Sequence, residues 1–234
     1  MILKRNFLLG LLGIAATLGC AAPAARELPV TAAEQSSMTP ASVMEDLKQG
    51  NHRYVQDRLS APNVHARLAA SSKGQYPKAV ILSCLDSRVP VEMIFDQGIG
   101  DVFVGRVAGN VENLDQLGSM EFAAKLSGVK LVLVLGHESC GAVKGACDGA
   151  QLGNLTGLLQ KIQPAVDAIE GFSEAERSSS NKAFVEQVVA ENVRQTVSDI
   201  RSGSAVLREL EEAGSIQIVG AIYSLQSGIV HWMP

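Results

Sequence analysis

Basic clusters, long apolar runs, internal repeats and cysteines are all scarce in this 234-residue chain. Its 20 Lys and Arg face 24 Asp and Glu, which gives a formal net charge of −4. The absence of a basic run or stripe argues against nucleic acid as a partner. No repeat or low-complexity tract divides the sequence, and its length is enough for one domain with a full core.

Only one apolar run stands apart from the rest, and it lies near the N-terminus. Lys4 and Arg5 precede the apolar stretch 7–18, and small residues follow at 19–25. This order indicates a secretory signal peptide, and the apolar part is shorter than the about 20 residues that a membrane-spanning helix needs. We therefore expect residues 1–25 to be removed on export. Without Lys4 and Arg5 the formal charge changes from −4 to −6.

Two cleavage sites compete at the end of this segment. Leu18-Gly19-Cys20 resembles the end of a bacterial lipoprotein signal, in which the cysteine is lipidated, although Thr17 stands where that pattern usually has Leu. Ala22-Pro23-Ala24 offers an ordinary small-x-small site. Both alternatives predict a periplasmic or otherwise exported protein, and the first adds a lipid anchor on Cys20.

The rest of the sequence predicts a polar tether over residues 26–38 and one folded domain over residues 39–234. Thr39 as N-cap and Pro40 at the first helical position predict the start of a helix. Near-continuous apolar runs at 78–83 and 129–135 are typical of strands buried on both faces. Further strands are expected at 101–107, 216–223 and up to Trp232, with helical stretches that include 114–126, 155–169 and 181–200. This alternation predicts a single α/β domain with a mostly parallel central sheet flanked by helices.

Metal-ligand residues follow two of the predicted strands. Cys84 and Asp86 come after the run at 78–83, and His137 and Cys140 come after the run at 129–135. Because sites in parallel sheets gather at the carboxyl ends of the strands, we expect these side chains to converge. Two thiolates and one imidazole suit Zn²⁺, and three protein ligands leave a fourth position for water, as in catalytic zinc sites.

Simpler interpretations exist for the same residues. Each cysteine taken alone is most simply a small buried hydrophobe, and a structural zinc site is the alternative for the set. A structural site normally has four Cys or His ligands, however, and no other Cys or His lies in a comparable place. Cys147 is left alone, which argues against a disulfide framework. The remaining histidines are interpreted as surface or core residues, with proton transfer by one of them as the less favoured alternative: His52, His65 and His231.

Cys84-x-Asp86-Ser87-Arg88 with His137-x-x-Cys140-Gly141 resembles the β-class carbonic anhydrases. Further family landmarks extend the resemblance over about residues 40–232: Gly50-Asn51-x-Arg53, Asp101-Val102-Phe103-Val104-x-Arg106, Gly118-Ser119-Met120-Glu121 and Gly220-Ala221-x-Tyr223. The resemblance implies an exported bacterial member of that family. Its activity would be reversible hydration of CO₂ to bicarbonate and a proton by zinc-bound hydroxide.

The resemblance also implies roles for the neighbouring residues. Asp86 either accepts a hydrogen bond from the hydroxide or takes the fourth zinc position in a closed state. Arg88 would pair with Asp86 and hold it off the metal, since guanidinium engages carboxylate in a bidentate way. Arg53 and Arg106 are interpreted as packing or interface residues. As in the family, we expect a homodimer or a higher homo-oligomer with the active cleft at the subunit interface.

Two alternative functions stay open at this point. One is a hydrolase of carbon disulfide or carbonyl sulfide on the same zinc site, and the other is a non-catalytic zinc-binding envelope protein. Retention of Asp86 and Arg88 argues against the second, because metal binding alone does not need that pair. Ile81 stands where members inhibited by bicarbonate carry Trp, so we expect no such inhibition here.

Overall fold

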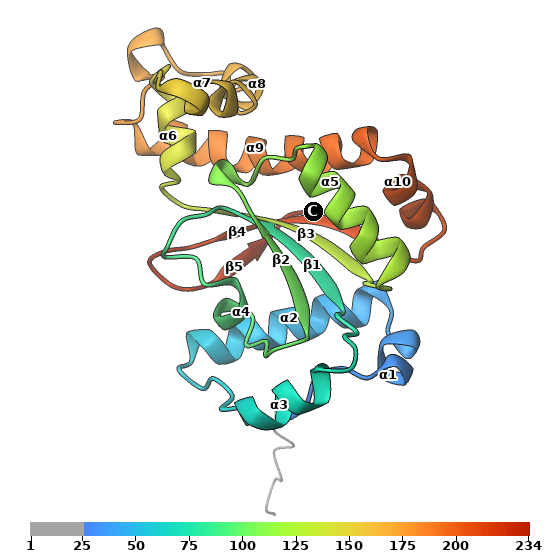
Figure 1. Ribbon diagram of the computed structural model, residues 1–234. Coiled ribbons are helices and arrows are strands. Elements are labelled where there is room, and N and C mark those ends of the chain that lie inside the picture. Colours follow the sequence, from blue (N-terminus) through green and yellow to red (C-terminus); the bar gives the residue numbers. More distant parts are fainter. Residues whose placement is uncertain (1–25) are drawn as a thin grey trace, which may run out of the picture.

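A computed structural model describes residues 26–234 of the protein (Figure 1). The predicted signal peptide, with Cys20 and both cleavage sites, lies outside the described residues. None of the helices in residues 26–234 is both long enough and apolar enough to cross a membrane.

Five strands form one sheet in the order β2-β1-β3-β4-β5. The strands are β1 (Ala79–Ser83), β2 (Val102–Arg106), β3 (Leu131–His137), β4 (Gln217–Tyr223) and β5 (Val230–Trp232). The first four are parallel and β5 runs antiparallel to β4, which confirms the predicted α/β fold with a mostly parallel sheet. Because β1 and β3 are neighbours in register, with Ser83 opposite Leu135, their carboxyl ends open at the same edge.

Helices cover both faces of the sheet. Their bounds are α1 (Ala32–Ser37), α2 (Pro40–Val55), α3 (Val64–Ser71), α4 (Val91–Ile94), η1 (Ala108–Asn110), α5 (Leu114–Glu121), η2 (Phe122–Leu126), α6 (Gly141–Cys147), α7 (Gly153–Gln160), α8 (Gln163–Asp167), η3 (Glu174–Glu176), α9 (Lys182–Gly203) and α10 (Ala205–Glu212). The predicted start of α2 is confirmed, since Thr39 caps it and Pro40 is its first residue. The expected helices at 114–126 and 155–169 are each divided: η2 continues α5 as a π-helix, and α7 and α8 are separate.

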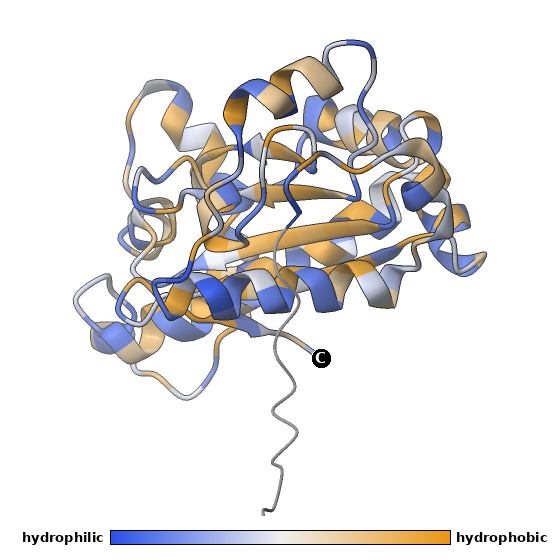
Figure 2. Ribbon diagram, turned by 90° about the horizontal axis from the view of Figure 1, so that it is seen from below, coloured by the Kyte–Doolittle hydropathy of each residue, from blue (hydrophilic) through white to orange (hydrophobic). Residues whose placement is uncertain are grey.

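Successive residues of the central strands point into two different cores, as the pleat of a strand requires. Ile81 and Leu133 pack with α2 and α4, whereas Leu82 and Val134 pack with α5, α9 and α10. Figure 2 shows the strands as an apolar layer between helices that are apolar on one side and polar on the other. Burial on both faces explains why β1 and β3 are almost entirely apolar in sequence.

Residues 26–38 differ from the expected polar tether. Thr31 caps α1 with a reciprocal capping box, and Val30 is only 3% exposed. The side-chain amide of Gln35 donates to the carbonyl oxygens of Pro77 and Ser127, at 2.6 and 2.8 Å. The polar composition of residues 26–38 suggested a segment surrounded by solvent. Because the Gln35 side chain instead binds two backbone carbonyls of the domain, the segment packs onto the fold.

Candidate metal centre

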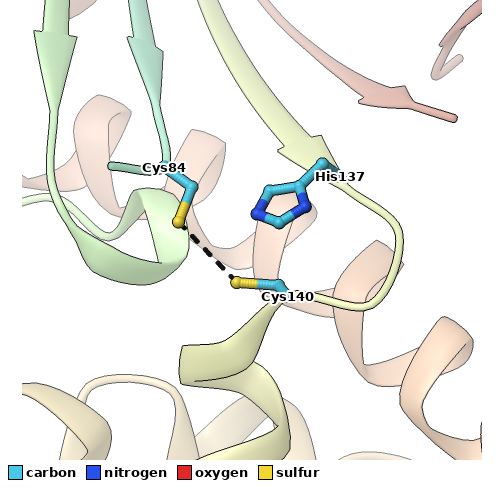
Figure 3. Close-up of side chains that lie close together, drawn as sticks. All are labelled: Cys84, His137 and Cys140. Atoms are coloured by element: carbon cyan, nitrogen blue, oxygen red, sulfur yellow. Dashed lines mark hydrogen bonds between the residues drawn. The ribbon is translucent and has the colours of Figure 1, made fainter. Parts of the chain in front are cut away.

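Three ligand side chains converge at the carboxyl end of the sheet. Cys84 follows β1, His137 is the last residue of β3, and Cys140 is the N-cap of α6. Their donor atoms all lie within 4.8 Å of one another, and the two sulfur atoms are 3.9 Å apart. Figure 3 shows the three side chains pointing toward a common centre. All three residues are buried, with exposed fractions of 4%, 0% and 1%.

The backbone explains how residues so distant in sequence meet. Parallel pairing places the ends of β1 and β3 side by side, and it places His137 opposite Tyr223. Ser139 has a φ of +52°, a left-handed conformation that is uncommon for a residue other than glycine. This turn brings Cys140 back beside His137 before α6 begins. A strained residue held at this point is typical of a functional loop.

The free ring nitrogen of His137 indicates where a metal would bind. His137 Nδ1 lies 2.8 Å from the carbonyl oxygen of Glu138, which acts as acceptor and leaves the proton on Nδ1. Nε2 is buried and has no hydrogen-bond partner among the described residues. Such an orphaned atom is costly unless a ligand satisfies it.

The sulfur geometry fits zinc as well. Two thiolates about 2.3 Å from a tetrahedral zinc ion lie about 3.8 Å apart, close to the 3.9 Å observed here. Hydrogen bonding from the Cys140 thiol lowers the pKa of Cys84 to about 4, and the same interaction, with burial, raises the pKa of Cys140. The pair therefore shares a proton that a divalent cation would displace.

Asp86 and Arg88 form an ion pair beside this group. Arg88 Nε lies 2.9 Å from Asp86 Oδ1 and its Nη2 lies 2.7 Å from Oδ2, which is the bidentate arrangement expected. Arg88 thereby holds the pKa of Asp86 well below its usual range. Asp86 Oδ2 is 3.8 Å from His137 Nε2, yet Asp86 does not belong to the group of mutually close donor atoms. The carboxylate thus lies next to the three candidate ligands but is not positioned as a fourth ligand.

Arg106 has a role that the sequence did not reveal. Its Nε donates to the carbonyl oxygen of Cys84 at 3.0 Å, and its Nη2 donates to that of Asp86 at 2.5 Å. Both acceptors belong to the loop that carries the first ligand and the carboxylate. Arg106 therefore braces this loop from β2, in addition to any contact it makes with a partner.

The backbone of η1 also contacts the site. The Gly109 N–H donates to Cys84 Sγ at 3.3 Å, and the side chain of Asn192 donates to the Gly109 carbonyl oxygen at 2.8 Å. Asn192 lies on α9, 83 residues away from Gly109. A hydrogen bond to the sulfur stabilises its thiolate form, so α9 supports the Cys84 thiolate through Gly109.

Within residues 26–234, the remaining cysteine and the remaining histidines lie away from this group. Cys147 is half-buried at the end of α6, and His52, His65 and His231 are exposed. None of them belongs to the group of close donor atoms. Their interpretation as residues outside the site agrees with these positions.

Comparisons with known proteins agree with the geometry. The family model described as carbonic anhydrase matches residues 79–230. The chain is 37% identical over 197 residues to carbonic anhydrase 2 of Mycobacterium tuberculosis, covering 81% of this chain and 90% of that protein. It is 34% identical to a carbonic anhydrase of Mycolicibacterium smegmatis, covering 82% and 92%.

Solved structures show the same fold. The β-carbonic anhydrase CafA of Aspergillus fumigatus superposes with a TM-score of 0.63 at 25% identity, over 82% of this chain and 89% of that chain. A tetrameric β-carbonic anhydrase of Sordaria macrospora gives a TM-score of 0.60 at 24% identity, over 69% and 83%. The family match over residues 79–230 spans β1 to β4 and both segments that carry the ligand residues.

Proposed function

The chain belongs to the β-carbonic anhydrase family, whose reaction is zinc-dependent hydration of CO₂ to bicarbonate and a proton, and we propose how its own residues carry out that reaction. The observation that carries the proposal is the buried set of Cys84, His137 and Cys140, in which His137 Nε2 has no hydrogen-bond partner among residues 26–234. When bound, zinc supplies a Lewis acid that, in the three-histidine carbonic anhydrases of unrelated fold, lowers the pKa of water from about 15.7 to about 7.

Asp86 orients the attacking water in this proposal. Because its pKa is held well below the usual range, Asp86 is a carboxylate throughout the working pH and can only accept hydrogen bonds. Its Oδ2 faces the site, 3.8 Å from His137 Nε2. A carboxylate there fixes the direction of the O–H bond and leaves an oxygen lone pair for the small apolar substrate. Positioning of this kind lowers the entropic barrier to attack.

Arg88 and Arg106 hold Asp86 in that position. The exposed Arg88 side chain donates a hydrogen bond to each carboxylate oxygen of Asp86, and Arg106 donates one to the Asp86 backbone carbonyl. With its side chain 56% exposed, Arg88 contributes little to fold stability, since water and salt screen an exposed ion pair. Its contribution is therefore to the orientation of Asp86.

A stopped-flow assay of CO₂ hydration, run with zinc analysis of the same sample, tests the function. We expect proton release well above the uncatalysed rate and its loss in Cys140→Ser, which removes a soft ligand. Sulfide release from carbon disulfide or carbonyl sulfide, measured in parallel, addresses the alternative hydrolase. Zinc-loaded protein that releases sulfide but does not hydrate CO₂ would contradict the proposed substrate.

We also propose that the protein is a homodimer or a higher homo-oligomer. β2 is an edge strand of the sheet, and unpaired edges invite pairing with another chain. Large apolar side chains of α5 and η2, which come after β2 in the chain, are exposed, with Leu114 at 84%, Leu126 at 76% and Phe122 at 49%. The Phe122 ring contacts that of Phe103 on β2. A solvent-exposed apolar patch of this kind is typical of an interaction surface. Sedimentation analysis should give a dimer or larger species, and a monomer at micromolar concentration would contradict it.

Export is proposed from the pattern at the N-terminus alone. The basic, apolar and small regions of residues 1–25 support cleavage and a periplasmic location, with lipidation of Cys20 if the lipoprotein site is used. The intact mass of protein recovered from its native host distinguishes the two cleavage sites. An uncleaved chain in the cytoplasmic fraction would refute the proposal.

A further inference from the structure

Glu138, which lies between the ligands His137 and Cys140, is held at both its side chain and its backbone. We propose that Glu138 is a positioning residue whose carboxylate ties the metal loop, residues 137–140, to the turn between β4 and β5. In that position the Glu138 backbone carbonyl orients the His137 ring. The inference rests on the proposed function, because it concerns the same zinc site.

The carboxylate binds a segment far away in sequence. Glu138 Oε2 accepts a hydrogen bond from the Leu225 N–H at 3.0 Å and another from the Ser224 hydroxyl at 3.1 Å. Both donors follow directly after β4. Hydrogen bonds to an ionised acceptor are about twice as strong as neutral ones. The side chain is thus a tether between the metal loop and the turn 224–229.

The backbone of Glu138 connects this tether to the metal ligand. Its N–H donates to the Tyr223 carbonyl oxygen at 3.1 Å, which continues the pairing of β3 with β4 beyond His137. Its own carbonyl oxygen lies 2.8 Å from His137 Nδ1. Since that carbonyl accepts the Nδ1 proton, Nε2 keeps its lone pair and stays directed at the two sulfur atoms.

The turn to which Glu138 is tied is itself rigid. Asn51 on α2 is 6% exposed, and its amide donates to the carbonyl oxygens of Gly228 and Ile94 at 2.8 and 3.2 Å. Its Oδ1 accepts from the Val230 N–H at 2.9 Å. The position of the His137 ring is therefore fixed by the body of the domain through this turn and the Glu138 carboxylate.

The conformation of the metal loop makes such a tether necessary. Ser139 follows Glu138 with a left-handed φ of +52°, an unfavourable conformation for a residue with a side chain that persists only where neighbouring contacts hold it. Without the carboxylate contacts, the loop can relax and turn the Glu138 carbonyl away from His137. The expected consequence is weaker zinc binding.

A simple structural brace predicts a different result. If Glu138 only stabilised the fold, its removal would lower the stability of the zinc-free protein but leave the zinc affinity of the folded protein unchanged. A positioning role predicts that zinc affinity falls, because loss of partners that orient a metal ligand costs 10- to 100-fold. Zinc affinity therefore separates the two roles without any activity measurement.

The test measures the zinc dissociation constant by competition with a chromophoric chelator for wild type, Glu138→Ala, Glu138→Gln and Ser224→Ala. We expect Glu138→Ala to bind zinc about 10- to 100-fold more weakly. Glu138→Gln keeps an acceptor oxygen and should retain most of the zinc affinity. Ser224→Ala leaves the Leu225 N–H in place, so its zinc affinity should lie between those of wild type and Glu138→Ala. Glu170→Ala, at an exposed position, is the matched control and should equal wild type.

A spectroscopic readout accompanies the affinity. The His137 Nδ1–H proton should give a resolved, slowly exchanging NMR signal in wild type and Glu138→Gln, and exchange faster in Glu138→Ala. Unchanged zinc affinity in folded Glu138→Ala, or equal losses in Glu138→Ala and Glu138→Gln, would overturn the inference. Should Glu138→Ala fail to fold, an unchanged affinity in Ser224→Ala would overturn it instead. Failure of wild type to bind zinc would refute the proposed function itself.

Discussion

Replacing Asn192 by Ala tests the hydrogen bond that joins α9 to η1, whose backbone contacts Cys84. Asn192 is 2% exposed, and its amide donates to the Gly109 carbonyl oxygen at 2.8 Å. Gly109 in turn donates its N–H to Cys84 Sγ at 3.3 Å. The substitution removes the donor but leaves the carbonyl buried in the same place.

The size of the effect follows from that orphaned carbonyl. A buried acceptor left without a partner costs about 1–3 kcal/mol, so we expect a loss of about 2 kcal/mol in the free energy of unfolding. For a domain of about 200 residues, each kcal/mol lowers the unfolding midpoint by roughly 2–4 °C, which gives a fall of about 4–8 °C. Asn192→Asp should lose more, because it places a carboxylate oxygen against the carbonyl oxygen.

Urea unfolding of the zinc-free protein, followed by circular dichroism, measures this loss without a contribution from metal binding. Gln187→Ala is the matched control, since Gln187 is exposed on the same helix. Its free energy of unfolding should stay within about 0.5 kcal/mol of wild type. A change as small as this in Asn192→Ala, or an Asn192→Asp variant more stable than Asn192→Ala, would refute the reasoning.

Three further predictions concern activity, packing and reactivity. Asp86→Ala should abolish CO₂ hydration while zinc stays bound, because Asp86 lies outside the three-ligand group; unchanged turnover with full zinc content would remove Asp86 from the mechanism. Gly50→Ala would place Cβ 1.8 Å from the backbone oxygen of Phe95, so the free energy of unfolding or the soluble yield should fall sharply. Gly157→Ala on α7 meets no atom within 4 Å and serves as control. Burial raises the pKa of Cys147 to about 11, which keeps the thiol protonated and unreactive at pH 8. In zinc-loaded protein, iodoacetamide should therefore modify Cys147 slowly at pH 8 and faster toward pH 11. Rapid modification at pH 8 would contradict this.

The convergence of the three ligands could be predicted because it depends on local sequence signals. The apolar runs of β1 and β3 mark strands buried on both faces, and in a parallel sheet the residues after neighbouring strands share one edge. Cys84 and His137 follow these runs directly. Residue chemistry and strand topology together were therefore enough to predict that these side chains meet.

The groups that orient those ligands could not be predicted, because hydrogen bonds between distant segments leave no local pattern. Arg106 binds carbonyl groups, which any residue supplies, and Asn192 meets Gly109 across 83 residues. The polarity of Gln35 suggested a residue of a solvated linker, and only the fold shows that its amide binds two carbonyl oxygens. Backbone acceptors are identical along the chain, so only the fold shows which of them a side chain reaches.

X-ray absorption at the zinc edge of the purified protein tests the central claim most directly. We predict one zinc ion per chain with two sulfur neighbours at about 2.3 Å and a histidine nitrogen at about 2.0–2.1 Å. Cys84→Ser or Cys140→Ser should lose sulfur scattering. Active protein without zinc, or a zinc shell that lacks sulfur, would contradict it.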